Sequence, residues 1–83
     1  MRLRQDGLVW RQIDGDTILL DLQASRYLTT NSSGSFLLGL LTEEQDRDAL
    51  VAALVTEYGI PSSVAERDTD GFVDTLRERG LLA

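Results

Sequence analysis

The chain has 83 residues and a net charge of −6, and it contains no histidine and no cysteine. A chain of this length forms one small domain, expected over residues 1–83, and the missing residue types exclude disulfides, thiolate metal sites and histidine-based hydrolytic triads. The negative charge would repel a nucleic-acid backbone unless the 8 basic residues gathered on one face.

The hydrophobic content is that of an ordinary globular domain, at 42% of residues. No apolar run reaches the length of a membrane span, and no signal-peptide pattern follows the first residues. We therefore expect a soluble, cytoplasmic protein that carries no cofactor and no metal.

Two strands are predicted in the first quarter of the chain, at about residues 8–13 and 17–22. They are rich in β-branched and aromatic residues, and Asp14-Gly15 between them is typical of a tight hairpin turn. The period of two places Ile18, Leu20 and Leu22 on one face of the second strand, and we expect that face to meet the core. Leu3–Gln5 could add a short leading strand.

A third strand is predicted at about residues 26–30, after a second turn. The three strands then form an antiparallel meander with the third strand at its edge. An edge strand presents unpaired backbone donors and acceptors that can template another chain. Proline at Leu28 or at a neighbouring residue is expected to block such pairing.

Three helices are predicted after the strands, at about residues 32–41, 43–58 and 62–80. Asn31 or Thr30 would cap the first, Thr42 with Gln45 forms a capping-box pattern for the second, and Ser62 or Ser63 would cap the third. Gly59 and Gly80 are placed to end the second and third helices. The buried stripe expected along the third helix consists of Ala65, Phe72, Leu76 and, less centrally, Val73.

The order of elements predicts an α+β fold of the winged helix-turn-helix type, with a three-stranded antiparallel meander followed by three helices. Such a fold can insert a helix into a DNA groove or take a peptide between strand and helix. The third helix carries more acidic than basic residues, which disfavours DNA. Its acids are Glu66, Asp68, Asp70, Asp74 and Glu78, and its arginines are Arg67, Arg77 and Arg79.

Several segments in order resemble the PqqD-like peptide chaperones, also described as recognition elements for ribosomally made, modified peptides. The resemblance runs from about Leu8 to the C-terminus. It is carried by DGDTILLD, by RYLTTN, by LVTEYGI and by VAERDTDGFVDTLRERGLL. Within that family the chain looks most like the free-standing members encoded with lasso-peptide maturation enzymes. One departure is the TTN sequence, because many members have a leucine before the asparagine.

The resemblance implies a non-enzymatic protein that binds the leader segment of a precursor peptide. Family members take the leader as an antiparallel strand on the third strand, covered by the third helix. The implied partners are the precursor leader peptide, a leader peptidase and a macrolactam-forming cyclase, with no nucleic acid and no membrane. The implied peptide-binding residues are Arg26, Tyr27, Leu28, Thr29, Thr30, Val64, Asp68, Phe72, Val73, Leu76 and Arg77.

Several of these residues also have a purely structural interpretation. Phe72, Leu76 and Tyr27 could be plain core residues, and Arg77 could be solvated or paired with an acid. Asp68 lies at the rim of an apolar stripe, where a contact with a leader is favoured over a solvated position. Two other functions stay open: a PqqD-type chaperone of another modified-peptide pathway, and a winged-helix DNA-binding regulator.

Overall fold

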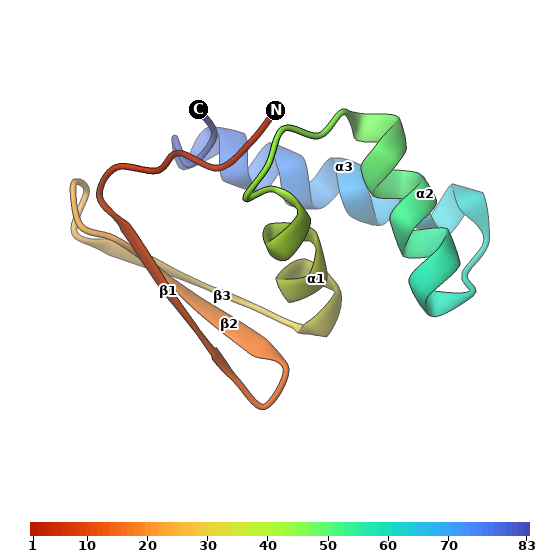
Figure 1. The fold of residues 1–83 in the computed structure, drawn as a ribbon, viewed down its shortest axis with the longest axis horizontal. Coiled ribbons are helices and arrows are strands. Elements are labelled where there is room, and N and C mark those ends of the chain that lie inside the picture. The colour runs from red at the N-terminus through yellow and green to blue at the C-terminus, as the bar shows by residue number, and fades with distance from the viewer.

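The computed structural model describes residues 1–83 and contains three strands followed by three helices (Figure 1). The strands are β1 (Leu8–Ile13), β2 (Asp16–Asp21) and β3 (Arg26–Thr30), and the helices are α1 (Ser32–Leu40), α2 (Arg47–Tyr58) and α3 (Ser62–Glu78). The sheet order is β1-β2-β3 and both pairs are antiparallel. The predicted meander, its edge strand and the α+β class are confirmed.

Tight turns explain why the strands fold back where they do. Asp14 and Gly15 both have positive φ angles, 53° and 87°, as a two-residue hairpin turn requires. The second hairpin turns through residues 22–25, and Ser25 takes a φ of 53° just before β3. Both turns were predicted from the sequence, at Asp14-Gly15 and across Gln23 to Ser25, and Asp-Gly and small polar residues accept this backbone.

The face of β2 that meets the core is the opposite of the one predicted. Thr17, Leu19 and Asp21 are buried, whereas Leu20 is 41% exposed and Leu22 is 62% exposed. Ile18 is half-buried on that same outer face. The inner face tolerates a hydroxyl and a carboxylate because each has a partner, Ser35 for Thr17 and Arg4 for Asp21. The outer side of the sheet is consequently rich in exposed apolar side chains.

The helix ends follow local capping rules with one correction. Asn31 caps α1 as expected, and its side chain accepts from the Gly34 amide at 3.0 Å. The predicted start of the second helix at residue 43 is wrong, because α2 begins at Arg47 with Asp46 as its cap. Thr42 instead donates its hydroxyl to the Gly39 carbonyl at 2.8 Å.

The boundaries of α3 differ slightly from those expected. Pro61 stands at its N-cap without a side-chain hydrogen bond, so neither serine caps it. The helix ends at Glu78, followed by Gly80 with a φ of 68°. Gly59 ends α2 in the left-handed region, as predicted.

The core lies between the helices and the inner face of the sheet. Its buried apolar residues are Leu3, Leu19, Leu37, Leu38, Leu41, Leu50, Leu54, Ala65, Val73, Leu76 and Leu81. On α3 the buried stripe is centred on Ala65, Thr69, Val73 and Leu76, and Phe72 is only half-buried. The stripe was therefore predicted about one position too far round the helix, which leaves Phe72 at a surface.

The two glycines inside α1 should respond oppositely to alanine. A Cβ added at Gly34 would lie 2.8 Å from Thr30 Cβ and 3.1 Å from Phe72 Cε1, whereas one added at Gly39 would meet nothing within 4 Å. We expect Gly39→Ala to raise the free energy of unfolding by about 0.5–1 kcal/mol through helix propensity. Gly34→Ala should lower it by about 1–2 kcal/mol through crowding. Urea denaturation of both variants checks this, and equal effects would contradict it.

The two ends of the chain lie side by side, as Figure 1 shows. Leu3 pairs with Leu82 in an isolated antiparallel bridge, and the Ala83 amide donates to the Arg2 carbonyl at 2.8 Å. The residues around Leu3 thus pair with the C-terminal tail and do not extend the sheet. None of the three helices combines the length and apolar character that a bilayer-spanning segment needs.

Candidate functional site

The outer border of β3 carries unpaired backbone groups. The strand register shows which residues they belong to. The Leu22 amide donates to the Gly7 carbonyl, so the even-numbered residues of β2 face β1 and its odd-numbered residues face β3. Because Leu19 pairs with Leu28, the backbone groups of Leu28 point into the sheet. Those of Tyr27 and Thr29 therefore point outward, onto the free border of the sheet.

A groove separates this border from α3. The close contacts of β3 are with β2 and α1, so α3 does not cover its outer edge. One hollow of about 250 Å³ lies over the end of β3, and a second of about 390 Å³ lies next to it along α3. Asn31, Gly34, Phe72 and Thr75 line both hollows, so the two form one continuous groove. The remaining lining residues are Leu28, Thr29, Thr30, Ser33, Leu37, Leu54, Arg67, Asp68 and Gly71.

Three buried hydroxyls connect the end of β3 to its neighbours. Thr17 donates to Ser35 at 2.6 Å, and the Ser35 and Thr30 oxygens lie 3.1 Å apart. These bonds join β2, β3 and the first turn of α1, where Gly34 allows the helix to approach Thr30 closely. The end of β3 is thereby fixed against α1.

A buried carboxylate organises the other end of β3. Asp21 Oδ1 accepts from Arg4 at 2.6 Å and from the amides of Gln23 and Ala24 at 3.1 and 3.2 Å. Arg4 also donates to the Gly80 carbonyl at 2.7 Å. One arginine therefore ties the β2–β3 hairpin to the residues that follow α3. This contact holds the hairpin that precedes β3 close to the C-terminal end of α3.

The pKa of Asp21 should make stability depend on pH. Burial acts to raise this pKa, but the Ala24 amide, Arg4 and the Gln23 amide together hold it below its usual range. The contribution to stability is therefore present above the unfolded value of about 3.9 and is lost as pH falls through that value toward the folded pKa. We expect Asp21→Asn to lower the unfolding free energy near neutrality and to flatten its decline below about pH 4. Denaturation series across pH check this, and an unchanged slope would contradict it.

A second ion pair joins the helices behind the groove. Arg47 donates to both oxygens of Asp70 at 2.7 and 3.0 Å, which links the start of α2 to α3. The hydrogen bond from Arg47 lowers the pKa of Asp70. This bidentate contact fixes α3 against the start of α2.

The structure brings together only part of the predicted site. Leu28, Thr29, Thr30, Asp68 and Phe72 line the groove, and Arg26 and Tyr27 stand at its hairpin end. Val73 and Leu76 lie in the core, 5% and 0% exposed, with no surface toward the groove. Val64 and Arg77 lie outside the lining, and Arg77 is exposed beside Asp74. The role of each residue in binding stays a prediction.

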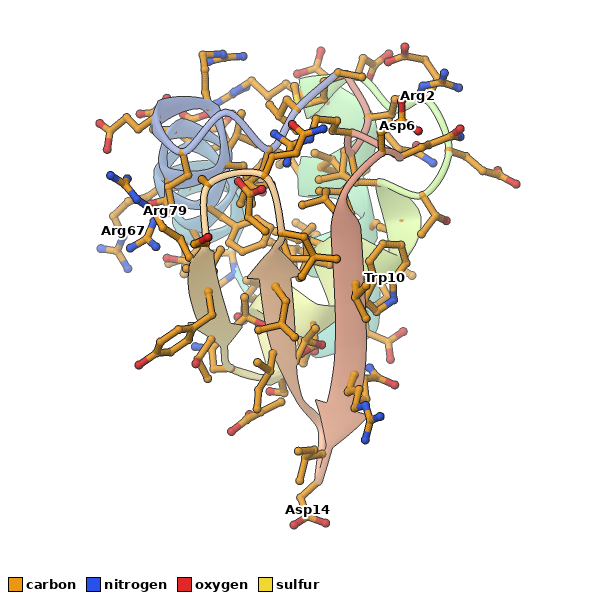
Figure 2. All side chains as sticks on the ribbon, turned by 90° about the vertical axis from the view of Figure 1, so that its left-hand side faces the viewer. Arg2, Asp6, Trp10, Asp14, Arg67 and Arg79 are labelled. Carbon is orange, nitrogen blue, oxygen red and sulfur yellow. The ribbon has the colours of Figure 1, made fainter.

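Several lining residues were missed by sequence reasoning. They include Asn31, Gly34, Gly71, Thr75 and Arg79. The α3 members recur at three- and four-residue steps from Asp68, so a helical face drawn through that residue would have included them. Arg79 contacts the sheet directly, because its guanidinium donates to the Tyr27 carbonyl at 3.2 Å. Figure 2 shows it beside the start of β3.

The groove contains no cluster of side chains that could bind a metal ion. No group of three or more aspartate, glutamate, histidine or cysteine side chains in the structure is placed to hold a metal ion. What the groove offers is a row of backbone hydrogen-bonding groups, an aromatic side chain, and charged residues at its two ends. Those are features for binding an extended chain.

Comparison with known proteins gives consistent matches. Residues 16–82 match the family model described as Coenzyme PQQ synthesis protein D (PqqD). The solved structure "TbiB1 in Complex with the TbiA(beta) Leader Peptide" is similar over 99% of this chain and 94% of that chain, with 32% identity and a TM-score of 0.86. The structure "Lasso peptide synthetase B1 complexed with the leader peptide" is similar over 96% and 93%, with 28% identity and a TM-score of 0.80. A comparison with curated proteins found no match.

Proposed function

Because the chain belongs to the PqqD family, we propose that it binds the leader segment of a ribosomally made precursor peptide and catalyses no reaction on it. The leader lies antiparallel to β3 as a fourth strand, between β3 and α3. The observation that carries this proposal is the free border of β3, where the backbone groups of Tyr27 and Thr29 face the groove beside α3. Both similar structures contain a leader peptide.

Strand pairing alone is too weak to hold the leader. Tyr27 and Thr29 offer about four backbone hydrogen bonds, each contributing about 0.5–1.5 kcal/mol. Association costs about 4–15 kcal/mol before the flexible leader is ordered. Two or three apolar leader side chains must therefore enter the hollows beside Phe72, each contributing about 1.5–3 kcal/mol on full burial. The backbone sets the register and the hollows set the specificity.

We also propose that the bound leader is presented to partner enzymes. One similar structure is that of a lasso peptide synthetase B1, which favours a leader peptidase and a macrolactam-forming cyclase as partners. The matched family model is named for coenzyme PQQ synthesis, which supports a second modified-peptide pathway as the alternative. The identity of the enzymes that co-purify with the chain and its leader discriminates between these two.

A DNA-binding role fits the charges less well. The surface of α3 is lined with acids, and the side chains of Asp68 and Asp74 are 47% and 70% exposed. A helix with this charge would repel the phosphates on both sides of a DNA groove. The acidic surface therefore favours a peptide ligand over a nucleic acid.

Direct titration tests the proposal. The probes are the fluorescently labelled TbiA(beta) leader peptide, labelled leader segments of small peptides encoded beside this chain, and a labelled DNA duplex. We expect saturable binding of at least one leader at micromolar concentration or below, with amide shifts confined to β3, α1 and α3. Salt-dependent binding of the duplex without binding of any leader would support the regulator instead.

A further inference from the structure

Two arginines at the hairpin end of the groove lack carboxylate partners. Arg26 and Arg79 both line a small hollow there, together with Leu19, Asp21, Tyr27, Leu28 and Leu81. Asp21 is the one carboxylate in this lining, and it pairs with Arg4 at 2.6 Å. Arg4, Arg47, Arg67 and Arg77 each lie within 4 Å of an acidic side chain, but neither of these two does. The guanidinium groups of Arg26 and Arg79 are therefore available to an acidic ligand, although the chain as a whole has a net charge of −6.

Arg79 is held at the border where a peptide strand would end. Its Nη1 donates to the outward-facing Tyr27 carbonyl at 3.2 Å. A guanidinium has five N–H groups and a carbonyl oxygen has two lone pairs, so this contact leaves donors free on Arg79 and acceptor capacity on Tyr27. A strand added to β3 could pair with Tyr27 while Arg79 binds another group of the same peptide.

The register decides which end of the peptide reaches these arginines. A strand antiparallel to β3 runs from Thr30 toward Arg26, so its C-terminal part arrives at the arginines. The peptide residue opposite Arg26 has its side chain on the same face as Arg26, because paired residues share a face. The residue two positions earlier lies opposite Leu28, on the groove side.

We propose that Arg26 and Arg79 bind a carboxylate of the leader. That carboxylate belongs to an aspartate or glutamate at the position opposite Arg26 or in the residues that follow it. The leader segment then has a defined order of residue types from its N-terminal to its C-terminal side. Apolar residues come first and enter the hollows beside Leu28 and Phe72, and an acidic residue follows them. At the opposite end of the groove, Arg67 and Asp68 lie 3.7 Å apart and pair with each other, so that end offers an acidic leader residue no unpaired arginine. This inference rests on the proposed function and specifies its ligand.

Selection from a library of random linear peptides tests the inference without knowledge of the natural leader. Peptides are selected on the wild-type protein, on Arg79→Met and on Arg11→Met, the last being a control on β1 with no acidic partner and far from the groove. We expect wild type and Arg11→Met to enrich aspartate or glutamate C-terminal to the apolar residues. Arg79→Met should lose that enrichment while still selecting the apolar residues.

A titration then measures the interaction in one selected peptide. Replacing its acidic residue by the matching amide should weaken binding to the wild-type protein about tenfold, and binding to Arg79→Met by far less. Selected peptides without acidic enrichment, or with acids on the N-terminal side, would overturn the inference and leave the proposed function standing. Failure of every variant to select any peptide would overturn both.

Discussion

Thr29→Pro should weaken binding of a leader peptide by about 100-fold while the protein remains folded. The Thr29 amide points outward and makes no bond within the sheet, so proline removes a donor that only the peptide uses. The pyrrolidine ring also blocks the approach of a neighbouring strand. Fluorescence anisotropy with a bound leader, together with thermal unfolding of the free protein, measures both effects.

Gln12→Pro is the matched control, since it places proline on the other edge of the sheet. Gln12 lies on β1, and the same register argument turns its amide outward, away from β2. Both variants should lose a similar small amount of stability, and only Thr29→Pro should lose the peptide. Equal affinity in the two variants would show that the leader does not pair with β3.

The position of this proline corrects the expectation from sequence. Proline at Leu28 was predicted to block strand addition as well as proline at a neighbouring residue. The backbone groups of Leu28, however, point toward Leu19 and not toward the free border. Proline at Leu28 would remove a bond between β2 and β3 and destabilise the fold itself. Loss of binding in that variant would carry no information about strand addition.

Phe72→Ala should weaken leader binding by about 10- to 30-fold. Phe72 is half-buried and lines both hollows of the groove, where it is the aromatic surface available to an apolar leader side chain. Its removal also takes packing from the free protein, so a loss of about 1–3 kcal/mol in unfolding free energy should accompany the effect. Calorimetric titration and urea denaturation separate the two quantities.

Phe36→Ala controls for that loss of packing. Phe36 is also half-buried, and it packs edge-to-face on Tyr58, with ring centroids 5.8 Å apart. It lies outside the residues that line the groove. We expect a comparable loss of stability with little change in affinity. A similar loss of binding in both variants would mean that Phe72 acts through the fold and not through contact.

The order and type of elements could be predicted from sequence because the signals are local. Asp14-Gly15 specifies its own turn, Asn31 caps the helix that follows it, and Gly59 ends the helix before it. The start of α2 was missed because two capping signals compete within five residues. Thr42 is used to close the preceding turn, and Asp46 bonds the Ala49 amide at 2.7 Å.

The inner face of β2 could not be chosen from its own residues. Alternation defines two faces, and the more apolar one was assigned to the core. The burial of Thr17 and Asp21 depends on Ser35 and Arg4, which lie elsewhere in the chain. A buried polar face is predictable only when its partners are known, and those come from the tertiary fold.

The candidate site was predicted in part. The features that were predicted and those that were missed differ for a physical reason. The edge position of β3 follows from the chain order, and the family resemblance adds α3 as the opposite wall. The PqqD resemblance itself is confirmed by the family match. Arg79 and Gly34 were missed because their importance lies in distances to Tyr27 and Thr30 that no local pattern encodes.

Because the two chain ends lie side by side, the protein can be circularly permuted. A short linker from Ala83 to Met1 would close the backbone into a ring, since Leu3 and Leu82 already pair there. Cutting that ring at Asp14-Gly15 yields a circular permutant that starts with β2 and finishes with β1. Every residue from Arg26 to Arg79 then stays on one unbroken stretch. Leader capture by such a permutant would depend on the assembled topology and not on the order of synthesis.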